Sequence, residues 1–125
     1  ICPVSKETQL VVLSIRRLVE ALIRVHDISG KELGFNRALL LPALSVRVAD
    51  MQQALHRAGG DRAIKQILWK PEASIQKIYN EYPRQIFSER AKKLGIHADE
   101  TIDEIVQYFI QDDLEIQKNF IRHTS

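Results

Sequence analysis

The stretch Leu10–Ile28, LVVLSIRRLVEALIRVHDI, decides the fold that the sequence predicts. Twelve of its nineteen residues are aliphatic, which is too many for the single apolar stripe of a surface helix. Its polar residues recur at helical spacings of four, four and three, so they form one ridge: Arg16, Glu20, Arg24 and Asp27. We therefore expect a long helix that begins near Ser5, ends near Ile28 and is buried on most sides.

The rest of the chain also shows apolar residues at helical spacing. Ser45–Asp50 is the nearest approach to a strand, because Val46 and Val48 alternate with polar residues there. A longer run from Leu44 to Ala58 steps by four and three, and it favours a helix instead. Glycines, prolines and capping residues divide the expected helices. We place them at about residues 36–57 with an interruption at Pro42, then at 61–69, 71–82, 84–94, and from 99 or 101 onward with a break near 112–113.

These elements predict an all-α fold. We expect a compact bundle of six to seven helices with orthogonal packing around a long, mostly buried first helix, since no heptad pattern is sustained. A length of 125 residues suits one domain, so residues 1–125 are expected to form a single helical domain. The chain begins with Ile1 rather than methionine, which we take to indicate a processed protein or a domain cut from a longer one.

Cysteine usage and hydropathy indicate where the protein resides. Cys2 is the only cysteine, so the sequence offers neither an intramolecular disulfide nor a cysteine-rich zinc site. This usage favours a reducing compartment, and we expect a cytoplasmic protein. Charged residues interrupt the longest apolar run, which is too short to span a membrane. We therefore expect no signal peptide and no membrane partner.

Charge is unevenly distributed along the chain, although the net charge is only +2. Residues 1–94 hold sixteen Lys and Arg against nine Asp and Glu, whereas residues 95–125 hold two against seven. One interpretation is that the basic body and the acidic segment attract each other within the fold. The other is that the body presents a basic face to an anionic partner.

Residues 61–82 have the layout of a helix-turn-helix unit, in which a second helix enters the major groove of DNA. Several side chains in and beside this unit could address base edges or phosphates: Arg62, Lys65, Ser74, Gln76, Lys77, Asn80 and Arg84. Duplex DNA is therefore one candidate partner. Such regulators commonly form homodimers, for which the aliphatic first helix could supply the interface.

A second segment, Glu89–Phe109, also has helix-turn-helix spacing, but its second helix is acidic. Four carboxylates there would oppose binding to a polyanion: Asp99, Glu100, Asp103 and Glu104. We expect them to form an acidic surface that docks a basic partner or the chain's own basic body.

Aromatic residues gather in the second half of the chain, and they permit two interpretations. One is that they pack the core between the last helices. The other is that they anchor a protein partner, since large rigid side chains suit that role. On the second interpretation the partner site consists of Trp69, Lys70, Tyr79 and Tyr82.

The sequence predicts no catalytic, metal or cofactor site. Its four histidines, at positions 26, 56, 97 and 123, have no second ligand at a recognised spacing. No serine lies in a nucleophile motif, and no glycine-rich loop could cradle a phosphate. We predict a non-enzymatic helical module that binds another protein. The alternatives are a small DNA-binding transcriptional regulator that uses residues 61–82 and a helical accessory domain of a larger enzyme.

Overall fold

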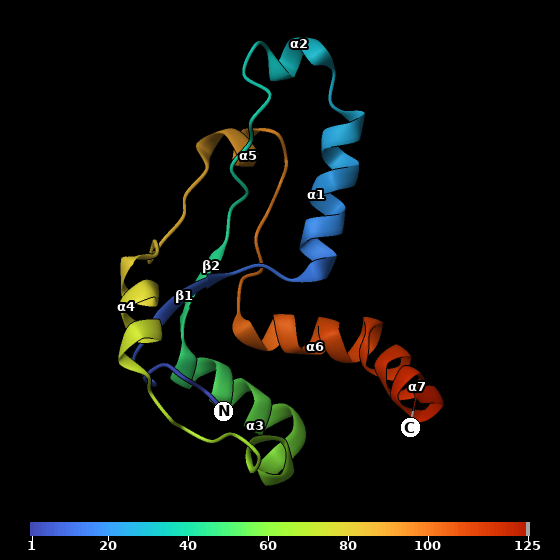
Figure 1. Ribbon diagram of the computed structural model, residues 1–125. Coiled ribbons are helices and arrows are strands. Elements are labelled where there is room, and N and C mark those ends of the chain that lie inside the picture. Colours follow the sequence, from blue (N-terminus) through green and yellow to red (C-terminus); the bar gives the residue numbers. More distant parts are fainter. Residues whose placement is uncertain (125) are drawn as a thin grey trace.

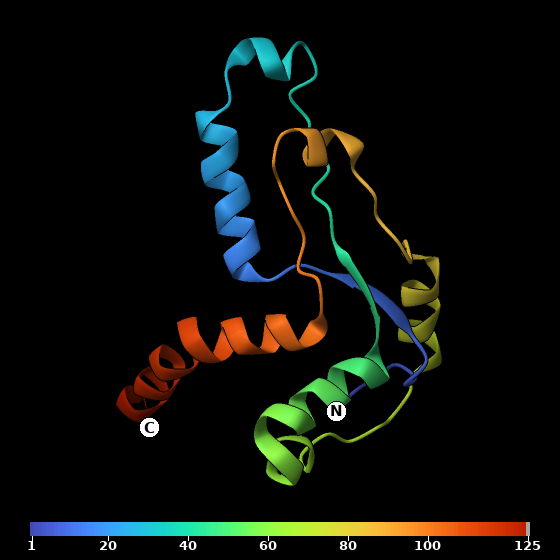
Figure 2. The same cartoon turned by 180° about the vertical axis from the view of Figure 1, so that it is seen from behind.

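The computed structural model describes the backbone of residues 1–124 and the side chains of residues 1–122. The elements follow in the order β1 (Gln9–Val12), α1 (Ile15–Asp27), α2 (Gly30–Leu33), β2 (Leu44–Arg47), α3 (Val48–Ile64), α4 (Ala73–Glu81), α5 (Glu89–Lys93), α6 (Ile102–Asp112) and α7 (Leu114–Thr124). α1 stands along one side, α2 lies at the top, and an extended segment returns to β2 and to α3 at the base (Figure 1). The view from behind shows α6 and α7 leading away from the body to the C-terminus (Figure 2).

A two-stranded antiparallel sheet takes the place of the start of the expected first helix, so the all-α prediction is wrong. β1 pairs with β2, with Leu10 opposite Val46 and Val12 opposite Leu44. The apolar run of β1 suits a helix or a strand equally when it is considered alone. Pairing with a valine-containing partner strand decides in favour of the strand, because branched side chains pack well on a pleated surface.

α1 begins only after Ser14, whose Oγ accepts a hydrogen bond from the backbone N of Arg17 at 3.2 Å and caps the helix. The expectation that the first helix is buried on most sides is also wrong, because Ala21 is the single buried residue of α1. Ala21 forms a small core with Ala91 and Ile96. Four partly buried residues pack against it: Val25, Leu39, Leu41 and Leu94. The chain is therefore not the compact bundle that its aliphatic content suggested.

Residues 34–43 contain no helix, although a helix was expected from about residue 36. Leu39 and Leu41 face the small core while Leu40 between them is exposed, which is the alternation of an extended chain. Arg90 of α5 holds the start of this segment. Its guanidinium donates to the carbonyl oxygens of Leu33, Asn36 and Ala38, and these contacts satisfy the backbone without a helix.

α3 continues through Gly59 and Gly60, where the sequence predicted its end. Gly60 has φ 66° and ψ −163°, so the helix kinks there in a conformation that is nearly exclusive to glycine. No helix lies between Ile64 and Ala73, and the helix expected at 61–69 shrinks to the last turn of α3. Residues 61–82 therefore do not form a helix-turn-helix unit.

The C-terminal predictions are largely confirmed. Thr101 caps α6 by accepting a hydrogen bond from the backbone N of Glu104 at 3.2 Å, and Asp113 separates α6 from α7. The helix expected over residues 84–94 is confined to α5. Among residues 1–124 no helix is both long enough and apolar enough to cross a membrane.

Four ion pairs among the described residues join the basic body to the acidic segment, and one of them is the 4.0 Å approach of Arg17 Nε to Asp99 Oδ1. Arg57 contacts Asp103 at 2.8 Å. Arg16 contacts Asp112 at 2.7 Å, and Arg17 contacts Glu104 at 3.1 Å. The attraction between the two regions of opposite charge is thus confirmed within the fold, and it orients α6 across α1 and α3.

Candidate functional site

A polar pocket of about 360 Å³ lies where the start of the chain meets α4. Its lining comes from the first residues, from the paired ends of β1 and β2, from α4 and from the segment after it: Ser5, Glu7, Thr8, Gln9, Arg47, Gln76, Tyr79, Asn80 and Arg84. The volume falls within the range of about 300–1,000 Å³ that is typical of small-molecule sites. Most of these side chains carry hydrogen-bonding groups, so the pocket suits a polar ligand.

Gln76 of α4 fixes one wall of the polar pocket. Its Oε1 accepts a hydrogen bond from the backbone N of Ser5 at 2.7 Å. Its Nε2 donates to Thr8 Oγ1 at 3.0 Å and to Asn80 Oδ1 at 2.9 Å. Thr8 is buried, and Ser5 Oγ lies 3.0 Å from its hydroxyl. One amide therefore orders both the first residues of the chain and the next turn of α4.

Arg47 stands at the end of β2 and belongs to a charged cluster. Its guanidinium contacts Asp50 at 3.1 Å and Glu7 at 3.3 Å. The hydrogen bond from Arg47 lowers the pKa of Asp50 below its ordinary value, and the same contact raises the pKa of Arg47. Arg47 thus has two anionic partners beside the pocket, and most of its charge is already balanced.

Arg84 is the cation of the pocket for which the described residues provide no anionic partner. Its carbonyl oxygen accepts a hydrogen bond from Ser45 Oγ at 2.5 Å, which fixes its backbone against β2. Among the described residues none forms an ion pair with its guanidinium. A planar guanidinium with free donors is well suited to a carboxylate or a phosphate, which it can bind through two hydrogen bonds.

The pocket thus combines one unpaired guanidinium with hydroxyl and amide groups. An anionic group could bind Arg84, while Ser5, Gln9 and Asn80 offer donors and acceptors for hydroxyls. Tyr79 closes one side, and its ring meets Tyr82 edge-on with 5.4 Å between the ring centroids. This chemistry fits a small hydroxylated anion.

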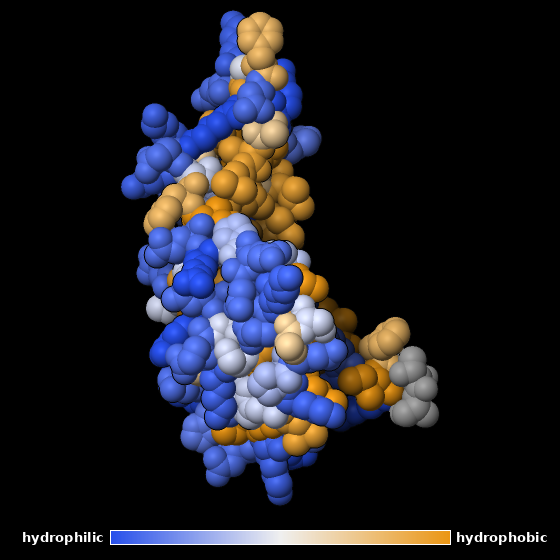
Figure 3. All heavy atoms as spheres, turned by 60° about the vertical axis from the view of Figure 1, so that its left-hand side comes forward, coloured by the Kyte–Doolittle hydropathy of each residue, from blue (hydrophilic) through white to orange (hydrophobic). Residues whose placement is uncertain are grey.

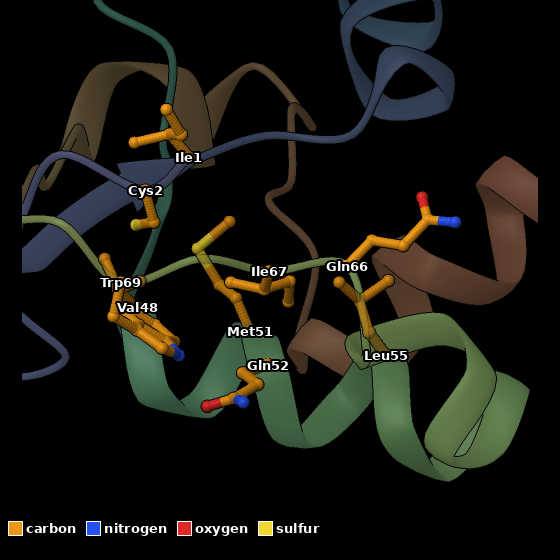
Figure 4. A pocket seen from close by; sticks show the side chains of 9 residues that line it. All are labelled: Ile1, Cys2, Val48, Met51, Gln52, Leu55, Gln66, Ile67 and Trp69. Atoms are coloured by element: carbon orange, nitrogen blue, oxygen red, sulfur yellow. The ribbon is translucent and has the colours of Figure 1, made fainter.

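A second pocket, of about 330 Å³, is apolar and lies between the start of the chain, α3 and the segment after α3 (Figure 4). Its aliphatic, sulfur and aromatic side chains include Val48, Met51 and Trp69. No charged side chain lines it, so it lacks a cationic side chain to pair with an anion. We therefore take the polar pocket as the candidate functional site.

The residues predicted to bind a protein partner do not form one site. Trp69 is half-buried in the wall of the apolar pocket, and its ring is covered by Lys6 Nζ at 5.0 Å from the ring centroid. Lys70 is exposed, and its backbone N donates to the carbonyl oxygen of Cys2. Tyr79 lines the polar pocket and contacts the ring of Tyr82, and neither tyrosine lines the apolar pocket that contains Trp69.

The residues predicted to contact nucleic acid divide into two groups. Gln76, Asn80 and Arg84 meet at the polar pocket. The sequence therefore identified three residues of this pocket, although it predicted that they bind nucleic acid. The others take no part in it: Arg62, Lys65 and Lys77 are exposed, and Ser74 donates to Glu72 within the same turn.

The four residues of the predicted acidic surface are mostly engaged within the fold. Asp99 is buried and accepts two hydrogen bonds from Ser14. Asp103 pairs with Arg57, and Glu104 pairs with Arg17 and accepts a hydrogen bond from Tyr108. Glu100 alone of the four is exposed.

The described residues contain no group of three or more His, Cys, Asp and Glu that is placed to hold a metal ion. His26 contacts Asp27, and His56 contacts Asp61, both on exposed surface. The side chain of His123 lies outside the described residues. His26 and His56 do not line either pocket.

Sequence reasoning missed the half of the polar pocket that comes from the start of the chain and from β2: Ser5, Glu7, Thr8, Gln9 and Arg47. A signal for Arg47 existed, because it alternates with Val46 and Val48 in the stretch that was nearly assigned as a strand. The first residues carried no comparable signal, since their role depends on contacts with α4, which lies some 70 residues further along the chain.

Comparison with known proteins shows what the chain is similar to, although no protein-family profile matches it. It is 37% identical over 111 residues to the D-erythronate dehydrogenase of Cupriavidus necator, a match that covers 89% of this chain and 34% of that protein. It is 28% identical over 114 residues to the D-erythronate dehydrogenase of Haemophilus influenzae, covering 91% of this chain and 36% of that protein. The chain spans about a third of the length of these relatives.

The fold matches part of a solved enzyme structure. It superimposes on the nucleoside-diphosphate-sugar epimerase from Agrobacterium tumefaciens with a TM-score of 0.83 and 29% sequence identity. The match covers 90% of this chain and 33% of the epimerase chain. All three similar proteins are named as enzymes.

These similarities correct the functional predictions. The prediction of a non-enzymatic protein-binding module is wrong, because the comparisons point to an enzymatic function. The alternative of a DNA-binding regulator is wrong for the same reason, and the structure removes its helix-turn-helix unit. The fold contains helices and a two-stranded sheet and resembles part of a nucleoside-diphosphate-sugar epimerase, so it is not a pure helical bundle.

Proposed function

We propose that the chain forms part of a dehydrogenase that acts on a small sugar acid of the D-erythronate kind, and that the polar pocket helps to hold this substrate. The observation that carries the proposal is the unpaired guanidinium of Arg84 beside hydroxyl and amide side chains. D-Erythronate is a short carboxylate that carries several hydroxyl groups, so it matches this set of donors and acceptors. A dehydrogenase is favoured over an epimerase because the identity to the dehydrogenase is higher, at 37% against 29%.

The proposal assigns substrate binding to this chain and assigns it no catalytic residue. The chain corresponds to about a third of each relative, and the reaction involves the whole protein. Arg84 binds the substrate carboxylate, while Asn80 and Gln9 accept or donate hydrogen bonds to the hydroxyls. Gln76 holds the wall of the pocket in place. We also propose a cytoplasmic location, which the use of a single cysteine in 125 residues supports.

A chimera tests the proposal directly. In it this chain replaces the matched region of the Cupriavidus necator dehydrogenase, and the product is assayed with D-erythronate. We expect activity, and we expect Arg84→Ala to raise KM for D-erythronate by roughly 10- to 100-fold while kcat changes less, since a charge-assisted hydrogen bond contributes about 1.5–3 kcal/mol.

Arg84→Lys and Arg62→Ala are the matched controls. Lysine retains the charge and should recover part of the lost affinity, whereas Arg62 is exposed at the end of α3 and its loss should leave KM unchanged. An active chimera whose KM is the same with Arg84→Ala as with Arg62→Ala would contradict the proposed role of the pocket.

A further inference from the structure

The surface of the chain is larger than its mass requires. Its accessible surface is 9331 Å² and its mass is 14.4 kDa. A folded monomeric protein of that mass is expected to expose about 6,800 Å². The excess of roughly 2,500 Å² is comparable with one side of a large obligate interface. Among the described residues no large side chain is fully buried, so the excess reflects apolar groups that lack a covering.

One face of α1 contributes several exposed apolar side chains to this excess of accessible surface. Ile15, Val19, Leu22 and Ile23 are 63%, 47%, 62% and 59% exposed. They lie at steps of four, three and one, which places them on the same side of the helix. The small core is contacted by another side of α1, the side that carries Ala21 and Val25. We call these four residues the α1 face.

Exposed apolar residues are not confined to the α1 face. Hydrophobic residues gather in the upper half of Figure 3, below the tip of the molecule that carries α2. Leu40, in the extended segment that packs beside α1, is 59% exposed, and Phe87 before α5 is 79% exposed. Exposed apolar surface of this extent is characteristic of an interface with another polypeptide.

We propose that the α1 face packs against the part of a longer polypeptide that corresponds to the unmatched two thirds of the relatives. The same fold occupies 33% of the Agrobacterium tumefaciens epimerase chain and the matching region occupies 34% of the Cupriavidus necator dehydrogenase. In both proteins a larger stretch of polypeptide therefore accompanies this fold. The proposal rests on the proposed function only in taking these relatives as guides to the whole protein.

The size of the excess surface favours this occupant over a second copy of the chain. α1 has 13 residues and is about 20 Å long, so a symmetric contact through one of its faces would cover only part of an excess of roughly 2,500 Å². A polypeptide that wraps α1 and the neighbouring extended segment together would cover more of it. A homodimer through α1 is the alternative outcome of the test.

Thiol labelling compares the α1 face in the 125-residue chain and in the chimera. In a Cys2→Ser background, Leu22→Cys introduces a thiol on the α1 face, and Ile78→Cys introduces one at a position of α4 that is 51% exposed. We expect labelling of the L22C thiol to be at least about tenfold slower in the chimera than in the chain alone, because burial blocks the reagent. The I78C thiol should react at similar rates in both proteins. Equal rates for L22C in the two proteins would overturn the proposal.

Thermal unfolding of the chimera tests independently whether the α1 face is buried in the longer polypeptide. Leu22→Asp should lower Tm by more than about 5 °C, whereas Ile78→Asp should lower it much less. Similar decreases for the two variants, or a chimera whose parts unfold separately, would count against the interface. If the chain alone sediments as a dimer that Leu22→Asp dissociates, the occupant is a second copy and the proposal is wrong.

The two proposals can fail separately. A chimera in which the L22C thiol is protected but D-erythronate is not oxidised would support the interface and contradict the proposed function. An active chimera whose L22C thiol is not protected would support the proposed function and contradict the interface.

Discussion

The buried carboxylate of Asp99 accepts both polar hydrogens that Ser14 can donate. Asp99 Oδ2 lies 2.8 Å from the backbone N of Ser14, and Oδ1 lies 2.6 Å from Ser14 Oγ. The side chain of Asp99 has no exposed surface, and Arg17 Nε approaches it at 4.0 Å. Ser14 in turn caps α1, so a single carboxylate fixes the start of α1 to the segment that precedes α6.

Asp99→Ala should therefore destabilise the fold substantially. The substitution leaves the hydroxyl and the backbone N–H of Ser14 buried without an acceptor, and we expect the free energy of unfolding to fall by about 3 kcal/mol. Urea unfolding of the chimera, followed by far-ultraviolet circular dichroism, measures the change. Glu100→Ala is the matched control, because its side chain is exposed next to Asp99 in the sequence. A loss for Asp99→Ala as small as that for Glu100→Ala would show that the contact is not important for stability.

Gln76→Ala should disturb the polar pocket without removing any group proposed to bind the substrate. The N–H of Ser5 and the hydroxyl of Thr8 lose their partner, and we expect a loss of about 1–2 kcal/mol of stability. KM for D-erythronate in the chimera should rise several-fold, while kcat is nearly constant. The neighbouring exposed residue gives the control, Lys77→Ala, which should change neither quantity. An unchanged KM for Gln76→Ala would show that the pocket wall held by Gln76 does not affect substrate binding.

Acidification should weaken the contacts between α6 and the basic residues of α1 and α3. Hydrogen bonds from Arg57 lower the pKa of Asp103 below its ordinary value of 3.8, and those from Arg16 do the same for Asp112. A carboxylate whose pKa is lower in the folded state stabilises the fold above its unfolded pKa, and this stability is lost as pH falls through the folded pKa.

We therefore expect Tm of the chimera to fall between about pH 5 and pH 3, and to fall less steeply in Asp103→Asn. Differential scanning calorimetry at several pH values and at low salt measures the two slopes, since salt screens exposed pairs. Glu115→Gln is a suitable control because, among the described residues, Glu115 forms an ion pair with Lys118 within α7 and none with another element. If Asp103→Asn and Glu115→Gln both leave the slope of Tm against pH unchanged, the ion pair between Asp103 and Arg57 does not stabilise the fold.

Gly60→Ala should destabilise α3 at its kink. With φ 66° and ψ −163°, Gly60 occupies a region that other residues enter only at a cost of about 1–3 kcal/mol. Urea unfolding should show a loss of this size. Gly30→Ala is the control, since it lies in the first turn of α2, where an added Cβ would meet only the side chain of Arg37 at 3.5 Å. A neutral Gly60→Ala would mean that the last turn of α3 straightens readily.

Local signals in the sequence predicted the C-terminal helices and failed at the sheet. Thr101 and Glu104 have the spacing of a capping box, and two successive aspartates precede α7, so both boundaries could be placed from nearby residues. β1 and β2 are only four residues each, and such short apolar runs carry too few residues to separate a period of two from a helical period. The choice between strand and helix at Leu10–Val12 is made by Leu44–Val46, some 34 positions away.

The candidate site was predictable only in part, because half of its residues come together through contacts between distant parts of the chain. Gln76 and Asn80 were predicted as exposed polar residues of a helix over 71–82, and Arg84 as a basic residue just beyond it, and these are local properties. Their association with Ser5 and Thr8 depends on how the start of the chain lies against α4, and no periodicity in either segment reports it. The exposed apolar face of α1 was misjudged in the same way, because an aliphatic helix has the same pattern whether its covering lies inside this chain or in another stretch of polypeptide.

Arg90 donates hydrogen bonds to the carbonyl oxygens of Leu33, Asn36 and Ala38, and these bonds limit how the loop after α2 can change in sequence and length. Carbonyl groups are common to every amino acid, so the three attachment points make no demand on the side chains of the loop. They do demand a fixed number of residues between the points of attachment. The loop should accept many different sequences but few insertions or deletions.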